Sequence, residues 1–317
     1  MRIADRIREV LVQNSFEDVF MVTGGMAMHL NDALTRNNKI KPTFFHHEQA
    51  CTMAAEGYTR QTGKKSLVCV TAGPGGINAL NGVFGAFNDS IPMLIISGQV
   101  RTDTLNKNRK LRQLGDQEAP ITDIVKKITK YSKIIDRKDH LDYELFKALE
   151  IMETPRKGPV WLDIPIDIQG SDYIAKEQKK YELTTSKSEN IDVEMKNLYK
   201  AILNSKRPLI MAGGGIRAAN AERYMSKLID NFNIPVVSAY NGHDLFFEKS
   251  EKYIGRCGTQ GDRRGNLAVE CADLIIALGT SLNIRQIGYN YDDFASDKFL
   301  CYIDVDPQEL DKKTIKK

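Results

Sequence analysis

An acidic side chain and a glycine-rich turn lie close together in the stretch from Lys41 to Asn78. The run Thr43 to His46 is aromatic and compact, which predicts a buried strand ending just before Glu48. The next apolar run, Leu67 to Val70, predicts a central strand covered on both faces, and Thr71-Ala72-Gly73-Pro74-Gly75-Gly76 follows it. Because open α/β sheets bind ligands beyond the carboxyl ends of their strands, we expect Glu48 and this turn to reach one ligand site.

Strands and helices alternate along the whole chain, which predicts parallel sheets covered on both faces. The expected strands are Asp18–Val22, Thr43–His46, Leu67–Val70, Met93–Ser97 and Val160–Ile164, then Leu209–Ala212, Pro235–Val237, Leu274–Leu278 and Leu300–Val305. The expected helices cover residues 3–11, 26–36, 50–62, 78–88, 121–131, 141–153 and 195–203.

A chain of 317 residues is too long for one ordinary domain. Residues 171–193 are poor in apolar side chains and rich in Lys, Glu, Ser and Thr, which indicates a surface linker. We therefore predict a first domain over residues 1–170 and a second over residues 194–317. The predicted fold class is α/β, with two doubly wound parallel-sheet domains, the second of them Rossmann-like.

The composition excludes several classes of partner. A net charge of +4 is mild, and basic and acidic residues are interleaved, so neither a nucleic acid nor a membrane surface is an expected partner. No apolar run is long enough to span a bilayer. The N-terminus reads as an amphipathic helix rather than a signal peptide. Five scattered cysteines without a CxxC pair favour a cytoplasmic location.

Several ordered motifs resemble the acetolactate synthase group of thiamine diphosphate enzymes. They are His47-Glu48-Gln49, Gly57-Tyr58-Thr59-Arg60-Gln61-Thr62-Gly63, Ala72-Gly73-Pro74-Gly75 with Asn78, Asn88-Asp89-Ser90-Ile91-Pro92, Ser97-Gly98-Gln99-Val100, and Lys157-Gly158-Pro159-Val160-Trp161-Leu162-Asp163-Ile164-Pro165. The resemblance implies that the first domain binds the pyrimidine ring of thiamine diphosphate and that the second is the central domain of such enzymes.

The resemblance also implies a catalytic role for Glu48. A carboxyl group bonded to the pyrimidine N1′ stabilises the imino tautomer of the cofactor, whose nitrogen can take the proton from C2 of the thiazolium ring. The plainer interpretation is a glutamate favoured by the dipole at a helix N-terminus.

The pyrimidine pocket would be lined by Gly24, Gly25, Thr71, Gly75 and Asn78. Thr71 and Asn78 also have a plainer interpretation, as ordinary turn and helix-start residues.

Gln117 is a second candidate catalytic residue, for contact with cofactor or substrate. It lies in Gly115-Asp116-Gln117-Glu118, where the resembling family has Phe-Gln-Glu. Asp116 replaces the aromatic residue, which indicates a substrate pocket that differs from that of an acetolactate synthase.

The second domain offers a flavin site or a packing turn, and the sequence leaves both open. Gly213-Gly214-Gly215-Ile216-Arg217-Ala218 fits G-x-G-x-x-A between a strand and a helix, although the expected acidic residue at the end of the next strand is missing. By the resemblance, Gly213, Gly215 and Arg285 would contact FAD. The alternative is a glycine turn that lets helix and strand pack closely.

We expect no metal site in this chain. His46, His47 and Glu48 are neighbours on an expected strand and would point to opposite faces. The resemblance implies that Mg²⁺ is held by a Gly-Asp-Gly segment followed by Asn on a third domain, and residues 1–317 contain no such segment. We therefore expect the chain alone to bind the cofactor poorly and to lack turnover.

The function implied by the resemblance is decarboxylation of a 2-oxo acid, pyruvate, with transfer of the acyl-carbanion equivalent to a carbonyl acceptor, in a homodimer or homotetramer. One alternative keeps this transferase or lyase chemistry with a keto sugar or another 2-oxo acid as the acceptor. The other alternative is a non-catalytic nucleotide-binding or assembly module.

Overall fold

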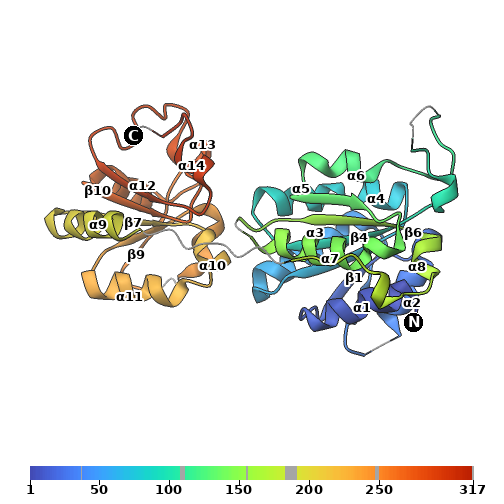
Figure 1. Ribbon diagram of the computed structural model, residues 1–317. Coiled ribbons are helices and arrows are strands. Elements are labelled where there is room, and N and C mark those ends of the chain that lie inside the picture. The colour runs from blue at the N-terminus through green and yellow to red at the C-terminus, as the bar shows by residue number, and fades with distance from the viewer. Residues whose placement is uncertain (37, 108–110, 155, 183–190, 247–249, 316–317) are drawn as a thin grey trace. The chain divides into compact units, whose positions relative to one another are not determined.

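The computed structural model describes residues 1–317 except 37, 108–110, 155, 183–190, 247–249 and 316–317. The chain divides into two compact units, Met1–Thr185 (unit 1) and Ser186–Lys317 (unit 2), which are described separately (Figure 1). Each unit is built on a parallel sheet with helices on both faces.

In the described part of unit 1, the sheet has six strands in the order β2-β1-β3-β4-β6-β5. All neighbours in this sheet pair in parallel. The strands are β1 Asp18–Met21, β2 Lys41–Phe44, β3 Ser66–Val70, β4 Met93–Gln99, β5 Tyr131–Ile134 and β6 Val160–Pro165. Strand β3 is buried throughout and pairs with β1 and β4, which confirms the central strand predicted for Leu67 to Val70.

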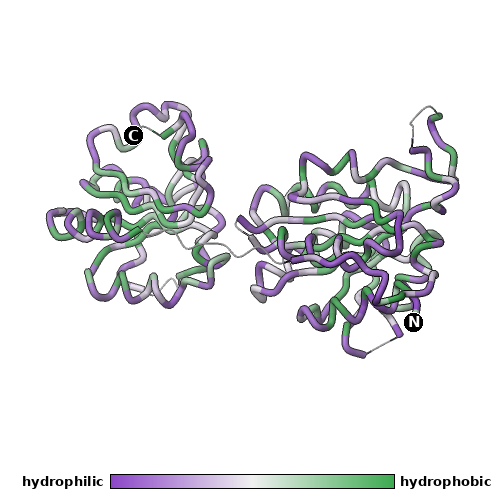
Figure 2. Tube along the Cα trace, viewed as in Figure 1, coloured by the Kyte–Doolittle hydropathy of each residue, from purple (hydrophilic) through white to green (hydrophobic). Residues whose placement is uncertain are grey.

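Two hydrophobic clusters lie on opposite faces of this sheet. Leu67 and Cys69 of β3 belong to one cluster, and Val68 and Val70 belong to the other, as the alternation of side chains along a strand requires. The first face is covered by α1 Ile3–Gln13, α2 Met28–Thr35, α7 Leu141–Glu153 and α8 Ile166–Gly170; the second by α3 Glu48–Thr62, α5 Leu80–Asn88 and α6 Ile121–Ile124. Figure 1 shows α1 and α2 on one side of the sheet and α5 and α6 on the other, and in Figure 2 the strands are mostly hydrophobic. The doubly wound arrangement is confirmed.

The edge strands differ from the sequence prediction. The expectation of a buried strand at Thr43 to His46 is wrong, because β2 lies at the sheet edge and Phe44 is 57% exposed. Strands β5 and β9 (Tyr253–Arg256) were not predicted. An edge strand pairs on one side only and need not be apolar throughout, so the run of apolar residues that marks a central strand is missing there.

The described part of unit 2 contains a five-stranded parallel sheet in the order β11-β10-β7-β8-β9. The bounds are β7 Pro208–Ala212, β8 Val236–Ser238, β10 Leu274–Leu278 and β11 Phe299–Ile303. Helices α9 Asp192–Asn204 and α11 Glu222–Phe232 cover one face, and α12 Arg263–Cys271 covers the other. The predicted Rossmann-like parallel sheet is confirmed.

In each sheet the chain reverses the direction in which it adds strands. One such switch point of unit 1 lies between β1 and β3, and that of unit 2 lies between β7 and β10. Ligands of open α/β sheets bind beyond the carboxyl ends of the strands at such points. A ligand site is therefore expected at the turns after β1 and β3 in unit 1, or after β7 and β10 in unit 2.

Part of the predicted linker packs on unit 1. The backbone N–H of Tyr173 donates to the carbonyl of Met1, and the Tyr173 hydroxyl donates to Asp142 over 2.8 Å. Residues 183–190 of the linker lie outside the described residues, and the domain limits at 170 and 194 stay a prediction. Among the described helices, none combines the length and the apolar character of a bilayer-spanning segment.

Candidate functional site

Glu48 is the first residue of α3, and its side chain is buried at the carboxyl edge of the sheet. The residue is 8% exposed, and its Oε2 accepts a hydrogen bond of 3.0 Å from Nδ2 of Asn78. His47 caps the helix, since its Nδ1 accepts from the backbone N–H of Gln49 at 3.1 Å. The start of α3 is thereby joined to the last residue of α4 (Pro74–Asn78), the short helix after β3.

Two glycines pack closely against Thr71 beside this carboxylate. A Cβ at Gly75 would lie 2.8 Å from Cγ2 of Thr71 and 3.4 Å from Oε1 of Glu48. A Cβ at Gly24 would lie 2.5 Å from Cβ of Thr71, whereas one at Gly25 would meet nothing within 4 Å. The structure thus brings Gly24, Glu48, Thr71, Gly75 and Asn78 together at the switch point of unit 1, with Gly25 beside open space.

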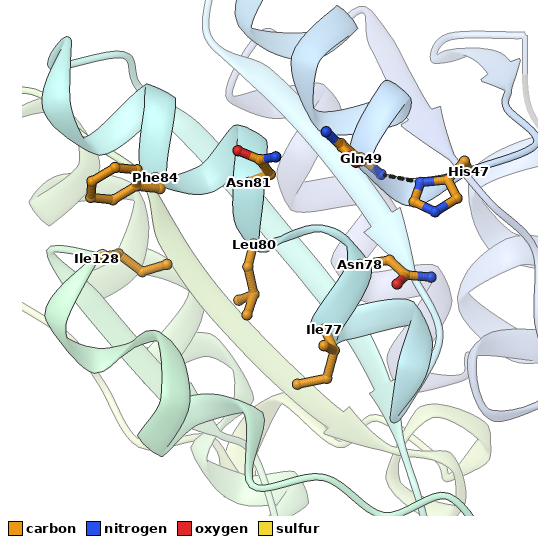
Figure 3. A pocket seen from close by; sticks show the side chains of 8 residues that line it. All are labelled: His47, Gln49, Ile77, Asn78, Leu80, Asn81, Phe84 and Ile128. Carbon is orange, nitrogen blue, oxygen red and sulfur yellow. Dashed lines mark hydrogen bonds between the residues drawn. The ribbon is translucent and has the colours of Figure 1, made fainter.

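Two hollows adjoin Asn78. The larger has a volume of about 560 Å³ and is lined by His47, Gln49, Ile77, Asn78, Leu80, Asn81, Phe84 and Ile128. Figure 3 shows the polar His47 and Gln49 at one side of it and the apolar Leu80 and Ile128 at the other. The second, of about 400 Å³, is lined by Gly73, Pro74, Ile77, Asn78, Gln117, Glu118 and Ala119. Ile77 and Asn78 border both hollows, so this face of α4 is open to a ligand from two directions.

Gln117 lies against the turn that precedes α4. Its backbone has φ 56°, and its carbonyl oxygen would be 2.2 Å from a Cβ at Gly73, which itself has φ 59°. Only glycine fits at position 73 because the left-handed backbone and the contact both exclude a side chain. The loop that carries Gln117 therefore closes over the turn after β3, within reach of the same hollow as Asn78.

Cys51 follows Glu48 by one helical turn and is fully buried. Burial raises the pKa of its thiol, and the neighbouring Cys69 and Glu48 add to the effect. Cys51 is therefore a neutral thiol that packs as a small hydrophobic side chain. All five cysteines of the chain are free.

Gln99 and Glu118 belong to the segments Ser97-Gly98-Gln99-Val100 and Gly115-Asp116-Gln117-Glu118, but no role was predicted for either residue. In the structure, Gln99 is buried and donates to the carbonyl of Ala119 over 3.1 Å. Glu118 accepts from backbone N–H groups of its own loop. Their position in the Ser97-Gly98-Gln99 and Gln117-Glu118 segments was the only signal in the sequence.

The glycine turn of unit 2 is closed by backbone contacts. The N–H of Gly213 donates to the carbonyl of Leu278, and that of Gly215 donates to the carbonyl of Gly279, each over 2.9 Å. A Cβ at Gly213 would lie 2.2 Å from the carbonyl oxygen of Gly279. Both N–H groups are thus committed to the neighbouring strand end and are not free for a phosphate.

Arg285 does not meet this turn in any described contact. It lies exposed in the four-residue helix α13 (Ile284–Ile287), and its backbone carbonyl accepts from the N–H of Thr259. Among the described residues, no group of three or more His, Cys, Asp or Glu side chains is placed to hold a metal ion.

A doubly wound parallel sheet with a buried carboxylate and a glycine cradle at its switch point is typical of a cofactor-binding α/β domain. Comparison with protein families is more specific. Residues 1–120 match the N-terminal TPP binding domain of thiamine pyrophosphate enzymes, and residues 195–316 match their central domain. The chain belongs to the thiamine pyrophosphate enzymes and carries these two domains.

Curated relatives align along nearly the whole chain. The acetolactate synthase large subunit of Haemophilus influenzae is 31% identical over 315 residues, which cover 98% of this chain and 53% of the relative. Acetolactate synthase 2, chloroplastic, of Brassica napus is 30% identical over 315 residues, covering 98% and 48%. The chloroplastic acetolactate synthase of Arabidopsis thaliana is 31% identical over 313 residues, covering 98% and 45%. The chain spans about half the length of these relatives.

Proposed function

We propose that this chain forms the pyrimidine-binding and central domains of a thiamine diphosphate-dependent carboligase of the acetolactate synthase type, which decarboxylates pyruvate and transfers the acyl-carbanion equivalent to a carbonyl acceptor. The observation that carries the proposal is the buried Glu48 carboxylate, joined to Asn78 and bordered by the bare Gly75. The family membership and the acetolactate synthase relatives support the same chemistry.

The residues of unit 1 fit the pyrimidine ring of the cofactor. When bound, thiamine diphosphate supplies the carbon nucleophile that attacks the 2-oxo acid. Asn78 engages Oε2 of Glu48, which leaves Oε1, next to Gly75, to share a proton with a ring nitrogen. Asn78 thus orients the carboxyl group, and Gly24 and Gly75 let the Thr71 side chain pack close beside it.

Gln117 is proposed to contact the 2-oxo acid or the cofactor from the second hollow, because it lines this hollow together with Asn78. The acceptor is a second pyruvate in the main proposal, which gives acetolactate. The exposed Asp116 next to Gln117 keeps a keto sugar or another 2-oxo acid as the alternative.

Homo-oligomerisation, as a dimer or a tetramer, is part of the proposal. Large apolar side chains are exposed along one side of unit 1, on α3, α4 and α5: Met53, Ile77, Phe84 and Phe87. A second copy of the chain would remove this surface from water. The five free cysteines support a reducing compartment, the cytoplasm, as the place of action.

The chain alone is proposed to bind thiamine diphosphate weakly and to lack turnover, because Mg²⁺ ligands of the Gly-Asp-Gly type do not occur in its sequence. Calorimetry of residues 1–317 with thiamine diphosphate and Mg²⁺ tests this. A micromolar affinity would show the proposal to be wrong.

The turn at Gly213 is proposed to serve packing rather than FAD binding, since its N–H groups are already paired. A purified protein without flavin absorbance is the expected result. A yellow preparation that releases FAD on denaturation would contradict it.

Product analysis tests the activity itself. The holoenzyme, which here means the full-length protein that contains residues 1–317, loaded with thiamine diphosphate and Mg²⁺, is expected to release carbon dioxide from pyruvate and to form acetolactate. If decarboxylation occurs and acetolactate is absent, the acceptor is another carbonyl compound. If pyruvate and other 2-oxo acids are left unchanged, the carboligase assignment fails.

A further inference from the structure

The loop between β4 and α6, residues 101–119, is organised around the carboxylate of Glu118. Oε1 accepts from the backbone N–H of Asn106 at 2.8 Å, and Oε2 accepts from those of Leu114 and Gly115 at 3.3 and 3.4 Å. Apart from the short 3₁₀ turn Thr102–Thr104, the described part of the loop has no regular secondary structure. One charged acceptor thus binds backbone donors from two separate points of an otherwise irregular loop.

The end of the loop is tied to the sheet by Gln99 of β4. Its Nε2 donates to the carbonyl of Ala119 over 3.1 Å and to Oδ2 of the buried Asp163 over 2.8 Å. Asp163 in turn accepts from Ser97, which accepts from the indole N–H of Trp161. The carbonyl of Ala119 is therefore held by a network inside the core of unit 1.

Gln117 directly precedes Glu118 and Ala119, the two residues that these hydrogen bonds hold, and its backbone conformation is uncommon. A φ of 56° is sparsely populated by residues other than glycine, asparagine and aspartate, and it persists only where the surroundings impose it. The carbonyl oxygen of Gln117 lies where a Cβ at Gly73 would be only 2.2 Å away, and the side chain of the next residue, Glu118, is hydrogen-bonded to the loop at Asn106. Release of the Glu118 contacts would allow Gln117 to leave this position.

We propose that Glu118 is a positioning residue, which fixes Gln117 at the wall of the 400 Å³ hollow through its hydrogen bonds to the N–H groups of Asn106, Leu114 and Gly115. The proposal rests on the proposed function, in which Gln117 contacts the 2-oxo acid or the cofactor, and it is argued for contact with the 2-oxo acid. It adds a residue that acts on substrate affinity without touching the reacting atoms.

The first test follows backbone hydrogen exchange in the full chain, with no cofactor. In Glu118→Gln, one acceptor oxygen becomes an amino group, so a peptide covering residues 111–119 is expected to exchange about 10- to 100-fold faster than in the wild type. Asp103→Asn is the matched control, because it removes an exposed ion pair with Arg101 in the same loop and should leave this exchange rate unchanged. Unchanged exchange in Glu118→Gln, with the protein folded, would overturn the proposal.

The second test is a double-mutant cycle in the holoenzyme with pyruvate as the probe. Glu118→Gln and Gln117→Ala are each expected to raise KM for pyruvate about 10-fold, while kcat stays within about twofold of the wild type. In the double variant, KM should also be about 10-fold above that of the wild type, rather than about 100-fold. Additive effects would mean that Glu118 does not act through Gln117, and so would an unchanged KM in Glu118→Gln.

The two tests separate this proposal from the proposed function. Absence of pyruvate turnover in the wild-type holoenzyme refutes the carboligase assignment, while the exchange experiment still reports on the loop. Fast exchange combined with a normal KM refutes the positioning role alone.

Discussion

Unit 1 and unit 2 both place glycine turns at the switch point of a parallel sheet, and the two turns have different neighbours. In unit 1 the turn after β3 meets the buried Glu48, which comes from a third element, the start of α3. In unit 2 the turn after β7 is joined to the turn after β10 by backbone hydrogen bonds at Gly213 and Gly215. Among the described residues, the buried acidic side chains all belong to unit 1.

The difference lies in what fills the space that the missing Cβ leaves. At Gly75 the neighbours are the side chains of Thr71 and Glu48, whose polar atoms can serve a ligand. At Gly213 the neighbours are the carbonyl of Gly279, which already accepts from the N–H of Gly215, and the Cα and Cβ of Thr280, which are not polar. A glycine-rich turn therefore indicates that another group approaches the backbone closely. The sequence of the turn does not tell whether that group is a ligand or a neighbouring strand.

The largest effect is expected at Glu48. Glu48→Gln keeps the size of the side chain and an oxygen for Asn78 but removes the acid, so kcat with pyruvate should fall by about 10² to 10⁴ in the holoenzyme. Glu56→Gln, on the same helix and paired with Arg60, is the control and should stay close to the wild type. Steady-state kinetics measures kcat of both variants. Equal kcat values for Glu48→Gln and the wild type would mean that the turn after β3 does not serve a catalytic carboxyl group, and the contrast with the turn after β7 would fail.

A moderate effect on stability is expected at Gly213. Gly213→Ala forces a Cβ against the carbonyl of Gly279, so unit 2 should lose about 1–3 kcal/mol in free energy of unfolding. Gly214→Ala is the matched control, since its Cβ would come no closer than 3.5 Å to the carbonyl of Asn241 and its backbone is already helical. Urea unfolding of both variants measures this, and equal stability of the two would mean that the turn is not packed as described.

The smallest effect concerns Asp273, which joins the end of α9 to the start of β10. The hydrogen bond from Ser205, with those from the N–H groups of Lys206 and Arg207, lowers the pKa of Asp273 to about 2 from 3.8. Because the pKa is lower in the folded protein than in the unfolded chain, folding favours the ionised carboxylate. Its contribution to the free energy of unfolding is therefore complete above pH 3.8 and is lost as the pH falls towards 2. Because the carboxylate is partly solvated, Asp273→Asn should cost about 1 kcal/mol at neutral pH.

The check is unfolding of unit 2 at neutral pH and at the lowest pH at which the protein stays soluble, where the difference between variant and wild type should shrink. Asp230→Asn, on the exposed side of α11, is the control. If the free energy of unfolding of Asp273→Asn is lower than that of the wild type by the same amount at both pH values, the hydrogen bonds do not depend on the ionised carboxylate and the assignment is wrong.

The central strands and the turn at Thr71 to Gly76 could be predicted from the sequence because continuous apolar runs and glycine turns are local signals. Edge strands β5 and β9 could not, since their mixed composition reflects contact with one neighbour only. The role of Glu118 was hidden because its partners, such as Asn106, are not adjacent to it in the chain. The pairing of the Gly213 turn could not be predicted because its partner, Gly279, lies far away in the sequence.

The structure of the protein with thiamine diphosphate bound, determined by crystallography, is the most direct test of the central claim. We predict that a pyrimidine ring nitrogen lies within hydrogen-bonding distance of Oε1 of Glu48, with the ring beside Gly24 and Gly75. A pyrimidine ring bound elsewhere, or a Glu48 carboxyl group without contact to it, would contradict the account.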